Sequence, residues 1–188
     1  SRFDKTRVRW GGGGEDDVSG GGAYTHLTLL AESTGGMHNL FRLASLASLE
    51  GFYFKPRMDR ELLQTYSGGI IATTGCPGGE VQTMLRLGRY DDAVTAAAEF
   101  RDIFGRENYF VELMDHGLDI ENRVREGLLR LSKDLGIPPI ATNDSHYVHR
   151  EDAGAHEHLL CVSSGSTMAD PKRFRFTTTE LFFKTPDE

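Results

Sequence analysis

The apolar residues along this chain recur with two different periods. Short apolar runs of roughly four to eight residues predict buried strands, and apolar residues three and four apart predict helices with one buried face. We predict strands at residues 24–31, 69–74, 108–114, from 140 onward and at 181–184. We predict helices at residues 36–49, 60–66, 82–87, 90–104, 119–135 and 151–161.

Residues next to these segments set several of the boundaries. Asp59 is suited to be the N-cap of the helix that begins at Arg60. Gly51 and Gly136 are suited to end the helices that precede them. Two prolines precede Ile140 and limit pairing, so we expect that strand to begin at Ile140. The expected buried faces of the two helices at 36–49 and 119–135 are Leu40, Leu43, Ala44, Ala47, Val124, Leu128, Leu131 and Leu135.

Strands alternate with helices from residue 24 to about residue 161. This order predicts an α/β fold built from βα units with parallel strands. We count four or five units, too few to close an eight-stranded barrel, and find no internal repeat. Residues 1–23 are rich in glycine and poor in apolar side chains, so we expect a loop that is partly mobile.

Composition narrows the class of protein. The length of 188 residues suffices for one domain with a sizeable core. The net charge of −7 argues against non-specific nucleic-acid binding by this piece alone, but leaves open a local basic groove or DNA held by a neighbouring domain. The cysteines Cys76 and Cys161 give no disulfide framework and indicate a reducing cytoplasm, with Cys161 expected in the core.

Membrane association and targeting are not indicated by the sequence. No apolar run approaches the roughly 20 residues that span a bilayer, and we expect no signal peptide. It begins at Ser1 rather than at a methionine, so we expect an excerpt of a longer protein.

Asp144 and His146 are the first candidates for chemistry. They stand at the carboxyl end of the strand that begins at Ile140. Because residues two apart on a strand point to the same face, we expect the two side chains to project together from it. The carboxyl ends of strands are where α/β folds place their active sites. A carboxylate beside an imidazole is a half-site for a zinc- or manganese-like ion. The alternative is an Asp–His hydrogen bond that caps the next helix.

Further candidates lie at the ends of other predicted strands. Cys76 follows the strand at 69–74 and can be a ligand or a small apolar residue, while His26 near the first strand can be simply structural. Glu112, an acid within a strand, needs a partner if it is buried, and His116 follows the same strand. We treat Glu112 and His116 as candidates for supporting the ligands.

The segment at 51–59 is both aromatic and basic. Lys55 and Arg57 predict contact with a phosphate backbone, and aromatic packing at a barrel rim is an equal alternative. The run at 172–176 is either an exposed basic and aromatic patch or a loop with buried phenylalanines.

Five motifs occur in an order that resembles one family. They are Tyr24–Ala31, Asn39–Leu40, Gly51–Arg57, Gly75–Glu80 and Ala141–Tyr147. Together they are similar to the polymerase-and-histidinol-phosphatase (PHP) domain of bacterial DNA polymerase III alpha subunits, in their actinobacterial form. The resemblance implies part of a distorted seven-stranded βα barrel, with residues 24–188 as the C-terminal two-thirds of a PHP domain. The N-terminal strands and the polymerase domains would then lie outside this sequence.

The resemblance also implies a set of ligands. His26, Cys76, Asp144 and His146 would bind a cluster of up to three divalent ions, either zinc or manganese and magnesium, with Asp144 and His146 as catalytic residues. Cys76 stands where phosphatase relatives use histidine. The family's first His-x-His motif and the next His and Glu ligands are absent. The chain thus holds about four of nine expected ligands and would have an incomplete cluster and barrel by itself.

The implied function has two parts. The whole protein would synthesise DNA, and this domain would remove the 3′-terminal nucleotide of a primer as a 3′→5′ exonuclease. Its partners would be primer DNA, the other polymerase domains, the sliding clamp and other replisome subunits. It would act in the cytoplasm and would not bind a membrane. One alternative is a degraded PHP scaffold that docks a separate exonuclease subunit. Another is a free-standing histidinol phosphatase, against which Cys76 and the 55–57 loop argue.

Overall fold

The computed structural model describes residues 24–53 and 55–188. The glycine-rich segment that we expect to form a partly mobile loop, residues 1–23, lies outside the described residues. The described residues form a sheet of four strands, β1 (Thr28–Ala31), β2 (Ile70–Thr73), β3 (Tyr109–Leu113) and β4 (Pro139–Ala141). The described residues also form six α-helices, which are α1 (Thr34–Leu49), α2 (Arg60–Thr65), α3 (Glu80–Arg86), α4 (Tyr90–Phe104), α5 (Asp119–Leu135) and α6 (Ala153–Ser164). The prediction of a mixed α/β fold is confirmed.

The strands lie in the order β1-β2-β3-β4. β2 pairs with β3, and β3 with β4, in parallel, whereas β1 pairs with β2 antiparallel, with Thr28 opposite Thr73 and Ala31 opposite Ile70. The prediction of parallel strands throughout is therefore wrong at β1. An apolar run does not encode strand direction, and two helices, α1 and α2, connect β1 to β2 where a βαβ unit has one crossover. Among the described residues the sheet is open, with β1 and β4 at its edges.

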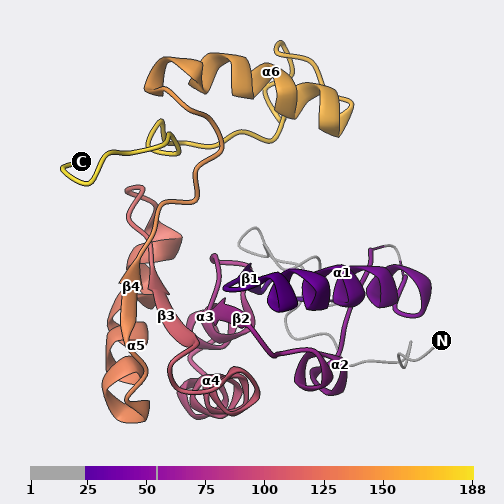
Figure 1. Cartoon of the computed structure of the whole chain (residues 1–188). Helices are drawn as coiled ribbons and strands as arrows, with labels where there is room; N and C mark the ends of the chain where they lie inside the picture. The colour runs from indigo at the N-terminus through magenta and orange to yellow at the C-terminus, as the bar shows by residue number, and fades with distance from the viewer. Residues whose placement is uncertain (1–23, 54) are drawn as a thin grey trace.

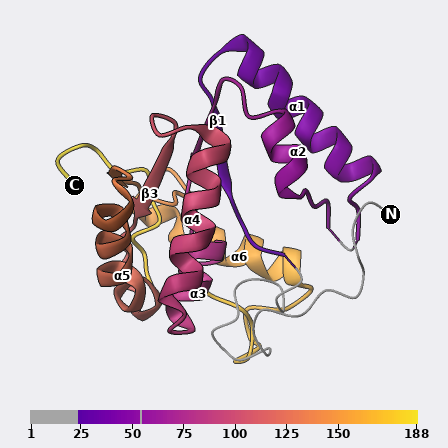
Figure 2. The same cartoon turned by 90° about the horizontal axis from the view of Figure 1, so that it is seen from below.

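The core lies between the sheet and helices α1 to α5. α3, α4 and α5 contact one another, and α4 and α5 contact β3 (Figure 1). Seen from below, α1 and α2 lie toward one end of the sheet and α5 toward the other (Figure 2). The buried apolar residues of this core are Leu43, Leu62, Leu63, Ile70, Ala72, Val81, Met84, Ala93, Ala96, Ala97, Phe100, Phe104, Tyr109, Val111, Val124, Leu128, Leu131 and Ile137.

Most predicted boundaries and faces are confirmed, but β4 begins at Pro139, which pairs with Val111, and not at Ile140 as predicted. Asp59 caps α2 by accepting a hydrogen bond from the Leu62 main-chain nitrogen at 2.9 Å, and Gly136 ends α5 in the left-handed region. Val124, Leu128 and Leu131 of α5 are buried as predicted. Leu135 and Leu40 are only half-buried, and Ala44 of α1 is exposed. The first strand is shorter and less buried than expected, because β1 is an edge strand and Leu30 is 54% exposed.

The C-terminal residues form an arm apart from the core. A 3₁₀ turn at Arg150–Asp152 leads into α6, and the tail returns beneath the helix, with Cys161 buried as predicted (Figure 1). The predicted strand at 181–184 does not form, and Phe182 instead makes a single bridge with Tyr147. Leu181 and Phe182 are buried, so the apolar run marked burial rather than strand pairing.

The 172–176 run in the tail matches neither alternative completely. Phe174 is exposed, whereas Phe176 is half-buried and packs against His156. The two phenylalanines contact each other edge to face. The segment is therefore a loop with one packed and one exposed aromatic ring.

No helix in the described part of the chain combines the length and the apolar character needed to cross a membrane.

Leu131→Ala tests the position of the core. Leu131 is 0% exposed on α5, so truncation should lower the free energy of unfolding by about 2–5 kcal/mol through lost burial and a residual cavity. Leu129→Ala on the same helix is the matched control, because Leu129 is 47% exposed and should cost far less. Urea denaturation of both variants measures the difference, and equal losses would contradict this packing.

Candidate metal centre

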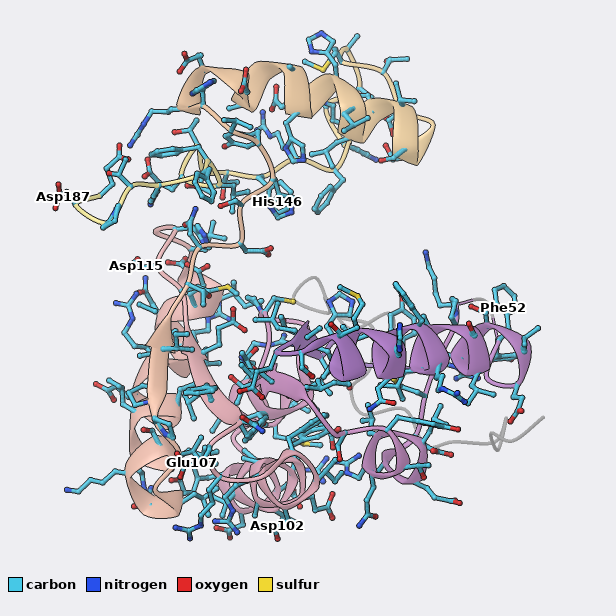
Figure 3. The ribbon with its side chains drawn as sticks, viewed as in Figure 1. Phe52, Asp102, Glu107, Asp115, His146 and Asp187 are labelled. Atoms are coloured by element: carbon cyan, nitrogen blue, oxygen red, sulfur yellow. The ribbon has the colours of Figure 1, made fainter. Side chains whose placement is uncertain are left out.

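The candidate site lies where three parallel strands end. β2 leads into the loop that carries Cys76, β3 into the loop at 114–118, and β4 into the loop at 142–149. Parallel strands end at the same edge of a sheet, so these loops gather at one end of the fold. Figure 3 shows Asp115 and His146 toward this end, opposite Asp102 and Glu107.

His26 and Cys76 are in direct contact, although 50 residues separate them in sequence. The His26 Nδ1 lies 3.3 Å from the Cys76 Sγ. His26 reaches this position because its main chain makes a parallel bridge with Gly79, donating a hydrogen bond to the Gly78 carbonyl at 3.0 Å. Gly75, with φ of +78°, permits the tight turn before Cys76. The structure thus pairs two of the predicted ligands.

Asp144 lies close enough to Cys76 to influence its ionisation. Burial raises the pKa of the Cys76 thiol, and the charges of Asp144 and Glu112 raise it further. The carboxylate of Asp144 is exposed in the loop after β4. A thiol in this setting retains its proton until a cation offsets the neighbouring negative charge.

His146 lies away from the His26–Cys76 pair. β4 ends at Ala141, so Asp144 and His146 lie beyond the strand, and the prediction that they project together from one strand face is wrong. The His146 Nδ1 instead lies 2.7 Å from the main-chain oxygen of Asp144. Its ring contacts His156 and Phe176, with centroids at 5.3 Å and 5.1 Å, and Figure 3 shows it on the side of the C-terminal arm. Its predicted role as a ligand stays a prediction.

Lys55 and Arg57 line a cavity of about 700 Å³ that His26 also lines. The guanidinium carbon of Arg57 lies 4.8 Å from the centroid of Tyr53. Glu80, at the start of α3, borders the same cavity and forms an ion pair with Arg60 at 2.7 Å. Aromatic packing and a basic cavity wall thus coexist in this loop. The predicted contact of Lys55 and Arg57 with a phosphate backbone stays a prediction.

Glu112 joins the ends of all three parallel strands. It is buried, and its carboxylate accepts hydrogen bonds from the hydroxyls of Thr73 on β2 and Thr142 just after β4, the latter at 2.6 Å. Its main-chain nitrogen donates to the Thr74 hydroxyl at 3.0 Å. The expectation that a buried Glu112 needs a partner is confirmed. The sequence analysis did not identify these threonines as hydrogen-bond partners of Glu112. Their position at the ends of the predicted strands is the feature that could have indicated this role.

His116 forms a second buried polar pair, with Glu121 of α5. The His116 Nδ1 lies 2.5 Å from Glu121 Oε1, and the His116 main-chain nitrogen donates to Oε2 at 2.8 Å. The hydrogen bond to Glu121 raises the pKa of His116. Burial would raise the pKa of Glu121, but hydrogen bonds from His116 and its charge lower that pKa overall. Glu121 was missed from the sequence, although an acid three residues after a helix N-cap is a capping signal.

The side chains at this site are of the types that bind metal ions, but too few of them lie together to hold an ion by themselves. Imidazole nitrogen, thiolate sulfur and carboxylate oxygen are the ligand types that zinc takes. Within residues 24–53 and 55–188, however, no three His, Cys, Asp or Glu side chains are grouped closely enough to hold an ion. The His26–Cys76 pair with Asp144 nearby therefore supplies part of a ligand set.

The fold and the site define an α/β domain with ligand-type side chains at the carboxyl edge of its parallel strands. The PHP domain family matches residues 4–116, more than half of the sequence, and the chain belongs to this family. It is 56% identical to the DNA polymerase III subunit alpha of Saccharopolyspora erythraea and 56% identical to that of Mycobacterium leprae. It is 45% identical to the subunit of Thermus aquaticus.

These three comparisons cover 100% of this chain but only 15–16% of each relative, so the chain spans about one-sixth of their length. The resemblance stated from the sequence motifs is confirmed, including its actinobacterial character.

The His116–Glu121 pair should make stability depend on pH. The raised pKa of His116 gives stability that is present below its unfolded value of 6.5 and is lost as pH rises through the folded value. The lowered pKa of Glu121 gives stability that is present above its unfolded value of 4.5 and is lost as pH falls through the folded value. The stability difference between the wild type and Glu121→Gln should therefore be largest between these values. Urea denaturation across a pH series measures it, and a difference independent of pH would contradict the charged pair.

Proposed function

We propose that this chain is part of a bacterial replicative DNA polymerase III alpha subunit. The similarity to such subunits extends over 100% of this chain, which supports the assignment. The chain matches only 16% of each of these relatives, which supports the presence of polymerase domains outside this sequence. Residues 24–188 would supply the C-terminal two-thirds of the PHP domain. The whole protein would synthesise DNA in the cytoplasm with the sliding clamp and other replisome subunits as partners.

We further propose that the PHP domain is a metal-dependent 3′→5′ exonuclease. The observation that carries this proposal is the 3.3 Å contact between His26 and Cys76 beside Asp144, at the carboxyl edge of the sheet. These three residues, with His146, would contribute to a cluster of up to three zinc, manganese or magnesium ions. The chemistry supplied by such a cluster is activation of water and neutralisation of phosphate charge.

Other roles in the reaction would belong to particular residues of this chain. Asp144, in the loop after β4, would present its carboxylate as a ligand of an ion beside the scissile phosphodiester. His146 would have to give up its contacts with His156 and Phe176 in order to reach Cys76. Lys55 and Arg57, on the cavity wall shared with His26, would hold phosphates of the primer strand.

The position of His146 supports a second candidate function. A PHP domain whose ligands no longer meet would brace the polymerase and dock a separate exonuclease subunit. In this reading His26 and Cys76 pack at the strand ends, and His146 belongs to the aromatic contacts of the arm. The two functions differ in bound metal and in nuclease activity.

Asp144→Asn in the full-length protein should lower the rate of removal of a mismatched 3′ nucleotide by at least about 100-fold. Loss of a residue that merely supports a ligand costs about 10–100-fold, and a lost ligand should cost more. Primer degradation on a gel, together with elemental analysis of bound zinc and manganese, measures the effect.

Asp102→Asn is the matched control for this variant. Its side chain is 70% exposed and lies toward the opposite end of the fold, so activity should be unchanged (Figure 3). Equal losses in both variants would argue against a role of Asp144 in the reaction. A wild-type protein with neither degradation nor stoichiometric metal would favour the scaffold function.

A further inference from the structure

Arg60, the first residue of α2, joins three helices. Its Nη2 lies 2.7 Å from Oε1 of Glu80 at the start of α3, and its Nε lies 2.5 Å from Oε2 of Glu99 on α4. Its guanidinium carbon lies 4.7 Å from the centroid of the Phe100 ring, which also belongs to α4. We call these four side chains the Arg60 cluster. In this cluster two carboxylates and one aromatic ring contact a single planar cation.

The charge balance of the Arg60 cluster argues against Arg60 itself as a phosphate ligand. One guanidinium faces two carboxylates, so the cluster carries a net negative charge. Glu80 is 7% exposed, and Arg60 is its ion-pair partner. A buried carboxylate that loses its cation is strongly destabilised, so Arg60 should stay with Glu80 rather than turn to a phosphate.

The Arg60 cluster connects the basic loop to the strand end that carries His26. Lys55 and Arg57 precede Arg60 by five and three residues, and all three line the cavity that His26 also lines. Glu80 follows directly after the residue whose main chain bridges with His26. The Arg60–Glu80 ion pair therefore ties one wall of this cavity to the segment beside His26.

The start of α3 is a closely packed attachment point for this ion pair. A Cβ atom added at Gly79 would lie 2.3 Å from the main-chain oxygen of Thr74, so the chain before Glu80 lies directly against the end of β2. The buried side chain of Gln82 donates a hydrogen bond to the Gly75 carbonyl at 2.6 Å. These contacts hold the first turn of α3 against the sheet, and with it the carboxylate of Glu80.

Apolar burial and the ion pairs hold different parts of the segment. Leu62 and Leu63 are buried in the core and fix the middle of α2. Within the loop, the Tyr53 nitrogen donates to the Lys55 carbonyl at 3.1 Å, which shapes the loop locally. The ion pairs of Arg60 attach the end of the loop to α3 and α4.

We propose that Arg60 is a positioning residue that holds the basic wall of Lys55 and Arg57 at a fixed place relative to His26. The wall would then contact phosphates of a DNA strand whose 3′ end lies on the His26 side of the cavity. Arg60 acts through the loop and does not itself touch the DNA. This inference rests on the proposed phosphate contact of Lys55 and Arg57.

Amine labelling of Lys55 in the full-length protein that carries this domain tests the inference. Lys55 is exposed, so an acetylating reagent should modify it, and a bound single-stranded oligonucleotide should protect it. Phosphorothioate linkages at the 3′ end keep the oligonucleotide from being degraded. Mass spectrometry of the peptide that contains Lys55 gives the oligonucleotide concentration that protects half of it, which is a measure local to this wall.

Glu80→Gln separates positioning from simple electrostatics by the sign of its effect. Removal of one negative charge from the cavity wall would by itself favour the oligonucleotide and lower the half-protecting concentration. Loss of the attachment to α3 should instead raise it about tenfold, the equivalent of one lost charge-assisted hydrogen bond. Arg60→Lys should also raise it although the net charge is kept, because an ammonium group lacks the planar fork that binds both carboxylates.

Two further variants complete the test. Glu99→Gln replaces Glu80→Gln if the latter fails to fold, because the Glu99 side chain is 49% exposed and its loss leaves the buried ion pair intact. It should raise the half-protecting concentration by a smaller factor. Arg101→Gln is the matched control, since it breaks the 2.9 Å ion pair with Asp102 on the same helix and should leave the protection of Lys55 unchanged.

Two results would overturn the inference, and they are distinguishable. If Glu80→Gln and Glu99→Gln lower the melting temperature but leave the half-protecting concentration unchanged or lower it, the Arg60 cluster is structural and the proposed phosphate contact stands. If the oligonucleotide does not protect Lys55 in the wild type, the proposed phosphate contact fails, and the positioning role fails with it.

Discussion

The arrangement of the candidate site depends on one buried carboxylate. Glu112 on β3 accepts hydrogen bonds from threonines that border β2 and β4, so a single side chain fixes the relative positions of three strand ends. A buried carboxylate without partners would be costly, and hydroxyl donors satisfy it without adding a positive charge. The loops that carry Cys76, His116 and Asp144 leave from these strand ends. These hydrogen bonds inside the sheet therefore help to set the spacing of the loops.

The C-terminal arm is held in a different way from the core. The helices α3, α4 and α5 bury a continuous apolar surface, whereas the arm joins the sheet mainly through polar contacts near its base. Among these are hydrogen bonds from the Thr178 hydroxyl to the His116 carbonyl and from the Asn143 amide to the Phe182 carbonyl. Because fewer apolar contacts hold it, the arm should open at lower free energy than the core. His146 would leave with the arm on such opening, because its ring contacts His156 and Phe176.

The sequence predicted local structure well because local rules decided it. The α5 stripe and the Asp59 cap follow from helix periodicity and capping chemistry, both of which act within a few residues. The direction of β1 could not be predicted in this way, since it depends on the path through α1 and α2. The position of His146 was missed because β4 ends three residues before Asp144, and a period of two holds only within a strand. The contact between His26 and Cys76 was expected only from the family resemblance, because nothing in residue spacing encodes it.

The electrostatics of the site link ligand binding to proton release. Cys76 is partly buried beside two acidic residues, so without a cation its thiol has a raised pKa and keeps its proton. The carboxylate of Asp144, which disfavours a thiolate at Cys76, would also attract a divalent ion, and an ion bound there would favour the thiolate in turn. The site therefore resists thiolate chemistry when empty and gains a strong sulfur donor only together with the cation. His116, which is paired with Glu121, lies close enough to Asp144 for the charge of that carboxylate to raise the pKa of His116.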